Sequence, residues 1–94
     1  MSLETLKNKK VALFCGIGNP ERFVEGIKAL GAEVVHRLFL ADHEAMDDFM
    51  MEKFGRTANS SGAEIVLCTE KDAVKISPEA IKKVGLPLAF LPID

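Results

Sequence analysis

The sequence lacks several features that would point to particular classes of protein. It has no tryptophan or tyrosine, and its two cysteines and two histidines are not spaced as a zinc signature. No apolar run approaches the roughly 20 residues that cross a bilayer, and the first ten residues, MSLETLKNKK, lack the apolar core of a signal peptide. The formal net charge is -2, so the one-sided basic surface of a nucleic-acid binder is missing as well. We expect no metal site, no leader and no nucleic-acid partner.

What the sequence does contain suits one small globular domain. Of its 94 residues, 48% are hydrophobic and 28% are charged, which is typical of a chain that buries a modest core. Cys15 and Cys68 fall within apolar runs, so we expect reduced thiols in the core of a cytosolic protein. We therefore expect a single domain over residues 1–94, with residues 1–8 flexible before the first element.

Short apolar runs alternate with helical patterns along the chain. The runs at residues 11–15, 32–40, 63–68 and 86–93 have the length and composition of buried strands. Helix start and stop signals lie between them, which gives the order β-α-β-α-β-α-β and implies parallel crossover connections. Pro87 and Pro92 cannot donate to a ladder, so the last run is expected either at a sheet edge or only partly paired. The predicted fold class is α/β: a small four-stranded, mostly parallel sheet with helices on both faces, as in a Rossmann-like three-layer domain.

The helix boundaries follow from capping residues. Asn19 and Pro20 are a typical start for a first helix over residues 20–30, and Gly31 is a typical stop. The side chains expected on the buried face of the second helix are Phe49, Met50 and Phe54. The other expected starts and stops are Asp47, Gly62, Ser77 with Pro78, and Gly85.

The candidate site lies in the loops beyond the carboxyl ends of the strands, where open α/β sheets bind ligands. The first of these loops contains Gly16 and Gly18. A dinucleotide fingerprint needs a third glycine where Glu21 stands, and a P-loop needs a lysine followed by serine or threonine, which is absent here. Two interpretations remain open: an anion held at the helix N-terminus beside Asn19, or a tight turn that requires small residues.

Two further loops at the same edge carry charged side chains. Asp42 and His43 directly follow the second strand, where His43 is either a general base, a partner for a carboxylate, or a surface residue. In the segment TEKD, Lys71 either binds a phosphate or lies on a solvated face. Asp72 follows a threonine at the spacing of a capping box. His36, within the second strand, is expected to be structural.

Taken in order, five segments resemble one family. FCGIGNPERF, LGAEVV, LADHEA, IVLCTEKDAVKI and PLAFLPID are similar to the C-terminal part of tetraacyldisaccharide 4'-kinase, the lipid A 4'-kinase of Gram-negative envelope synthesis. Each segment alone is a weak signal, but their order and spacing are specific. The resemblance covers residues 11–94.

The resemblance implies an activity for the whole enzyme. It transfers the γ-phosphate of ATP, with magnesium, to the 4'-hydroxyl of tetraacyldisaccharide 1-phosphate, at the cytoplasmic face of the inner membrane. The P-loop, the magnesium ligands and the presumed catalytic aspartate belong to an N-terminal part that this sequence does not contain. We therefore expect the chain alone to be inactive and to bind no cofactor. Its expected partners are the missing P-loop domain of the same protein and the lipid A disaccharide precursor, with peripheral membrane contact only through the full enzyme.

The resemblance also assigns roles to a few residues. His43 matches a family histidine thought to support the catalytic aspartate, and Asp42 is its acidic neighbour, with a less defined catalytic role. The chain departs from the family at Glu44, where many members have a second histidine, and at Asp47, where the helix usually starts with serine or threonine. The residues that we keep as neighbours of substrate or phosphate, without a chemical step, are Gly16, Gly18, Asn19, Lys71 and Asp72.

Two other functions fit the same residues. A stand-alone module without catalysis could bind an anion or a nucleotide at the carboxyl edge of the sheet. A purely structural or oligomerising α/β unit would bind no ligand.

Overall fold

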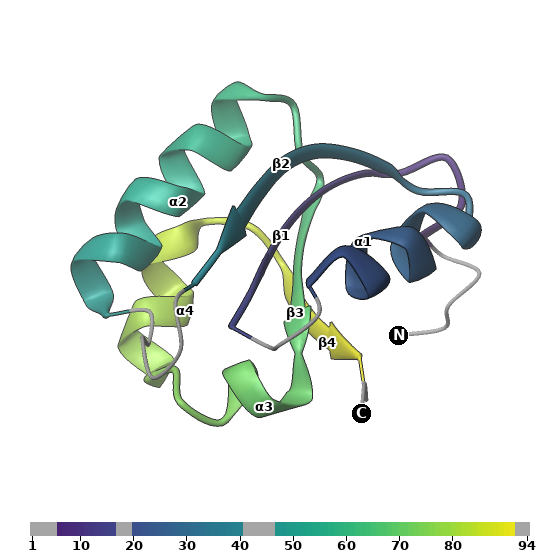
Figure 1. Cartoon of the computed structure of the whole chain (residues 1–94). Coiled ribbons are helices and arrows are strands. Elements are labelled where there is room, and N and C mark those ends of the chain that lie inside the picture. The colour runs from purple at the N-terminus through teal and green to yellow at the C-terminus, as the bar shows by residue number, and fades with distance from the viewer. Residues whose placement is uncertain (1–5, 17–19, 41–46, 92–94) are drawn as a thin grey trace.

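The computed structural model describes residues 6–16, 20–40 and 47–91. Its four strands form one parallel sheet in the order β2-β1-β3-β4, and helices follow each of the first three strands (Figure 1). This confirms the α/β class, with every strand pair parallel. The elements are β1 (Lys10–Cys15), α1 (Pro20–Ala29), β2 (Glu33–Phe39), α2 (Asp48–Ser60), β3 (Ile65–Thr69), α3 (Glu70–Ala73), α4 (Pro78–Val84) and β4 (Leu88–Leu91).

Alternate side chains of the central strands divide the core into two layers. Ala12 and Phe14 of β1 pack on the side of α2 and α4, where the Phe14 and Phe54 rings meet edge to face with centroids 5.4 Å apart. Leu13 and its neighbours on the other face pack against α1, together with Leu6 from the segment before β1. Figure 1 shows the sheet between α1 on one side and α2 with α4 on the other, which is the predicted three-layer arrangement.

The capping residues act as their sequence positions predict. The Asp47 side chain accepts a hydrogen bond from the Met50 amide at 2.8 Å and so caps α2. Ser77 caps α4 by accepting from the Ala80 amide at 3.1 Å, and α4 ends at Gly85 in the left-handed conformation (φ 75°). Local signals therefore determine these boundaries to within a residue or two.

The prediction for the buried face of α2 was wrong at Phe49. This side chain is 75% exposed, whereas the buried positions are Met51, Phe54, Gly55 and Ala58. At 100° per residue, a five-residue separation places Phe49 about 140° around the helix from Phe54. Phe49 therefore cannot share the buried face that begins at Met51.

The two edge strands of the sheet are β2 and β4, and only β2 departs from regular pairing. On β2 the register shifts, because Val11 pairs with Val34 but Ala12 pairs with His36. His36 lies on the α2 side, where its ring contacts the Phe54 ring at a tilt of 39°, with centroids 5.1 Å apart. The opposite edge is β4, as predicted from the proline that precedes it, and Pro87 accepts a bond from the Val66 amide through its carbonyl. Within the described ranges, no helix is long and apolar enough to cross a membrane.

Candidate functional site

The carboxyl ends of the parallel strands lie together at one edge of the sheet, with α3 beneath them in Figure 1. β1 ends there at Cys15 and continues into Gly16, and β2 ends at Phe39 and continues into Leu40. β3 ends at Thr69, which is also the cap of α3. Segments distant in the sequence therefore meet at this edge.

Asp72 is the chemically distinctive side chain of this edge. It is only 5% exposed, and both of its carboxylate oxygens lie within hydrogen-bond distance of the Gly16 amide, at 3.2 and 3.1 Å. The Thr69 hydroxyl donates to the same carboxylate at 2.5 Å. Thr69 in turn accepts from the Asp72 amide at 3.2 Å, which confirms the predicted cap. The structure thus joins the first loop to TEKD, which are separate features in the sequence.

Gly16 is also in close contact with the end of β2. A Cβ atom at Gly16 would lie 3.3 Å from Asp72 Oδ1 and 3.3 Å from Leu40 Cβ. The Leu40 amide donates to the Cys15 carbonyl at 2.8 Å. The absence of a side chain at Gly16 therefore lets Asp72, β1 and Leu40 approach one another.

Gly16 was predicted as a neighbour of substrate or phosphate. Its amide points at the Asp72 carboxylate, so a phosphate at this amide would have to approach a buried negative charge. Lys71 is exposed on α3 and forms no ion pair with another described residue. The remaining site predictions lie outside the described residues: Gly18, Asn19, Asp42 and His43.

Cys68 lies in the same region but is not a reactive thiol. Burial raises its pKa to about 12, and the Asp72 carboxylate and Cys15 act in the same direction. Because the thiolate is the nucleophile and the metal ligand, Cys68 is neither at neutral pH. Both cysteines are buried and form no disulfide, as predicted for core thiols.

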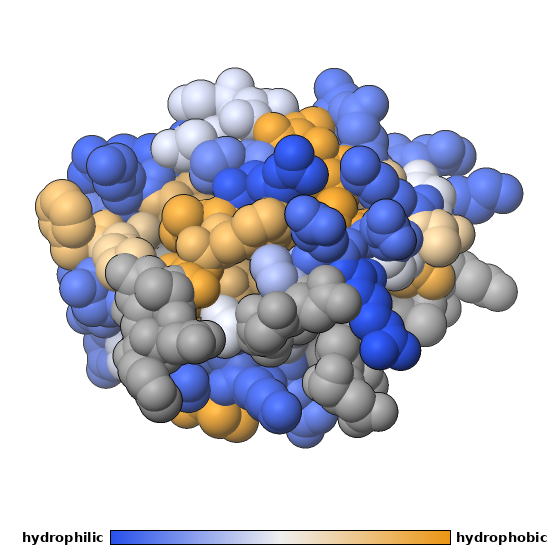
Figure 2. All heavy atoms as spheres, viewed as in Figure 1, coloured by the Kyte–Doolittle hydropathy of each residue, from blue (hydrophilic) through white to orange (hydrophobic). Residues whose placement is uncertain are grey.

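Large apolar side chains are exposed around this edge, a feature that sequence reasoning missed. They lie at the end of β2, in the first turn of α2, at the end of α3 and on β4: Phe39 (41%), Phe49 (75%), Val74 (78%) and Phe90 (52%). Figure 2 shows apolar atoms at several places on one face, including the left and lower margins, where the start of α2 and α3 lie in Figure 1. Exposed apolar side chains are typical of surfaces that contact another molecule or domain where they form a contiguous patch.

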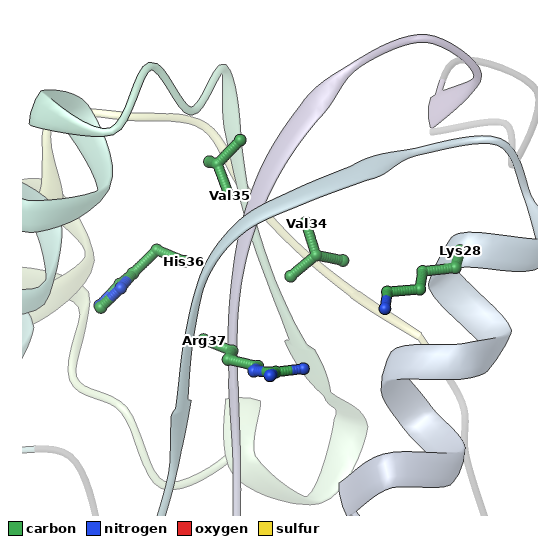
Figure 3. A pocket seen from close by; sticks show the side chains of 5 residues that line it. All are labelled: Lys28, Val34, Val35, His36 and Arg37. Atoms are coloured by element: carbon green, nitrogen blue, oxygen red, sulfur yellow. The ribbon is translucent and has the colours of Figure 1, made fainter.

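A concave region lies away from this edge, beside β2. It encloses about 430 Å³ and is lined by residues of α1 and β2. In Figure 3, Lys28 and Arg37 point toward the space beside Val34, whereas His36 points to the opposite side of the strand. Since the His36 ring contacts the Phe54 ring, its position supports the structural role predicted for it.

The sequence was compared with protein families and with individual proteins. The model of the tetraacyldisaccharide-1-P 4'-kinase family matches residues 1–94. The chain belongs to this family. A tetraacyldisaccharide 4'-kinase of Syntrophus aciditrophicus is 38% identical over 94 residues, covering all of this chain and 25% of the relative. The enzyme of Jannaschia sp. is 45% identical over 89% of this chain and 25% of the relative. The enzyme of Halothermothrix orenii is 43% identical over 86% of this chain and 21% of the relative.

The chain spans about a quarter of the length of these family members. No solved structure gives a significant match to it. The comparisons establish the family of the chain, which is the family that the five segments resemble.

The residues described at this edge do not fit magnesium-bound nucleotide by themselves. Phosphoryl transfer needs a loop of free amides, a lysine and acidic metal ligands around the phosphates. Over residues 6–16, 20–40 and 47–91, no three histidine, cysteine, aspartate or glutamate side chains lie together as metal ligands would. The Gly16 amide is already bonded to Asp72. The described residues therefore do not account for a catalytic step through nucleotide or metal.

Proposed function

We propose that the chain is the C-terminal part of a lipid A 4'-kinase, which phosphorylates the 4'-hydroxyl of tetraacyldisaccharide 1-phosphate with ATP and magnesium. The observation that carries this proposal is the family match over the whole chain, together with the chain's share of about a quarter of its relatives. The remaining part of the enzyme supplies the P-loop and the metal ligands, since phosphoryl transfer cannot proceed without them. By itself the chain is inactive.

The exposed apolar side chains support a docking role for the carboxyl edge. Phe49 and Val74 are each at least three-quarters exposed, which is costly for side chains of this size in water. In the proposed enzyme, the P-loop domain of the same protein covers this edge, and the substrate lies between the two parts. The enzyme works at the cytoplasmic face of the inner membrane, where its lipid substrate is found.

Within that arrangement His43 supports the catalytic aspartate of the other part. His43 follows Leu40 by three residues, and Leu40 is held at the carboxyl edge by its bond to β1. A neutral imidazole at this place can hydrogen-bond a carboxylate and fix its orientation. Asp42, the adjacent acid, has a lesser role in the same loop.

The test is a chimeric enzyme in which this chain replaces the matched segment of the Syntrophus aciditrophicus kinase. The chimera should phosphorylate tetraacyldisaccharide 1-phosphate, whereas the isolated chain should not. His43→Ala should lower the kcat of the chimera by at least about tenfold, within the range of effects seen for positioned acid–base groups.

The matched control uses the other histidine of the chain. His36→Phe keeps an aromatic ring against Phe54 and should leave kcat within about twofold, because aromatic pairing is preserved. Normal turnover by the His43→Ala chimera would remove the role given to this residue. A stand-alone binding module would be favoured instead if the isolated chain bound ATP saturably and if substitutions at its carboxyl edge abolished that binding.

A further inference from the structure

Asp72 is a buried carboxylate whose charge is held by hydrogen bonds alone among the described residues. No lysine or arginine of the described ranges forms an ion pair with it. Burying an ionised carboxylate is expensive unless its oxygens accept good hydrogen bonds. Asp72 accepts from the Gly16 amide and from the Thr69 hydroxyl, and such bonds to a charged acceptor are stronger than neutral ones. Its position is therefore closely defined by these two donors.

The contact with Gly16 reaches across 56 positions of sequence. Gly16 is the residue at which the chain leaves β1 and enters the first loop. An ionised carboxylate has no donor of its own, so both oxygens can face the same amide without conflict. The arrangement specifies where the first loop begins relative to β3.

The same contact extends to β2 through Leu40. A Cβ atom added at Gly16 would lie 3.3 Å from Leu40 Cβ, a tight contact that would require a shift of a few tenths of an ångström. The Leu40 amide is bonded to the Cys15 carbonyl. Displacing Gly16 would therefore displace Leu40, the residue that directly precedes the segment with Asp42 and His43.

We propose that Asp72 is a positioning residue of the kinase site: it fixes the points at which the loops after β1 and β2 leave the sheet. It acts on phosphoryl transfer only through Gly16 and Leu40, and it contacts no reacting group. This gives TEKD and the glycine loop a shared role. The catalytic part of the inference rests on the proposed function, whereas the positioning of the loops does not.

The first experiment uses the 94-residue chain and amide NMR. Asp72→Asn should shift the Gly16 amide proton upfield, because the charged acceptor is lost, and should also move the resonances of residues 41–46. Asp72→Ala should cause larger changes at the same positions. Circular dichroism establishes that each variant is folded, and if Asp72→Ala does not fold, the asparagine variant decides.

Glu64→Gln is the matched control. Glu64 Oε2 accepts from the Lys10 amide at 3.0 Å, so it makes the same kind of bond to the opposite end of β1. This variant should move the Lys10 amide and leave Gly16 and residues 41–46 unchanged. A folded Asp72→Asn chain with an unshifted Gly16 amide, or with changes confined to α3, would overturn the proposal.

The second experiment uses the chimera described above. Asp72→Ala should lower kcat per folded enzyme by about 10- to 100-fold, as expected for a displacement of about 1 Å at a catalytic edge. Asp72→Asn should lower it less, and Glu64→Gln should not lower it. Normal kcat in folded Asp72→Ala enzyme would refute the catalytic part. An inactive wild-type chimera would count against the proposed function, and the NMR result would then decide the positioning role.

Discussion

Replacing Gly55 with alanine should destabilise the domain, whereas the same replacement at Gly26 should stabilise it. Both glycines lie inside helices, where alanine is favoured by about 1 kcal/mol. At Gly26 a Cβ atom would meet nothing within 4 Å, so only the helix preference operates. At Gly55 a Cβ atom would lie 2.7 Å from the Val84 carbonyl oxygen and 2.8 Å from its Cα.

The size of the effect follows from the nature of the obstacle. Val84 meets Gly55 with backbone atoms, which cannot rotate away as a flexible side chain would. Forcing an extra methyl group into a packed core typically costs about 1–3 kcal/mol. A clash with backbone atoms lies near the upper end of this range, at about 3 kcal/mol. After the helix preference is subtracted, we expect Gly55→Ala to lower the free energy of unfolding by about 2 kcal/mol. For a domain of this size the melting temperature should fall by roughly 8–16 °C.

Urea unfolding followed by far-UV circular dichroism measures this directly, since the chain has no tryptophan to report by fluorescence. Gly26→Ala should gain roughly 0.5–1 kcal/mol. Adding Val84→Ala to Gly55→Ala should not restore stability, because the obstructing atoms belong to the backbone. A Gly55→Ala chain as stable as the wild type, or rescue by the truncated side chain, would refute the reasoning.

Two further predictions follow from the ionisable groups. Because burial, Asp72 and Cys15 raise the pKa of Cys68 to about 12, Ellman's reagent should label this thiol only after unfolding; rapid labelling of the folded chain would contradict the assignment. The hydrogen bond from the Lys10 amide holds the pKa of Glu64 below its ordinary 4.5, and the charge of Lys9 acts in the same direction. Glu64 therefore stabilises the fold fully above pH 4.5, and this contribution is lost as the pH falls through the lowered pKa of the folded state. The stability difference between wild type and Glu64→Gln should therefore shrink on acidification below 4.5, and a difference that stays constant or grows would exclude the linkage.

Local signals predicted most of the fold. Asp47 and Ser77 cap helices and Gly85 ends one because capping depends on a few neighbouring residues. The parallel sheet followed from the alternation of runs, which leaves few other topologies. Phe49 was misplaced because the phase of a helix face changes by 100° per residue, so a small error in spacing moves a side chain to the other side.

The candidate site was less predictable. Gly16 and Asp72 were each noted for local reasons, a turn and a cap. Their hydrogen bond depends on the pairing of β1 with β3, and no local spacing reports a contact across 56 positions. The register shift that turns His36 toward Phe54 is likewise set by tertiary packing. The roles given to Asp42 and His43 still rest on the family resemblance.

The two edge strands of the sheet bear on how the domain meets other copies of itself. An outermost strand exposes unpaired backbone groups that can recruit a strand from another chain, and proteins block this with bulges, prolines and short strands. Here the register shift interrupts β2, while β4 has four residues and follows Pro87. Neither edge offers a long, regular template for strand addition. The sheet is thus protected against open-ended self-assembly through its edge strands. Contacts with other molecules are then expected at the carboxyl edge, around which the large apolar side chains are exposed.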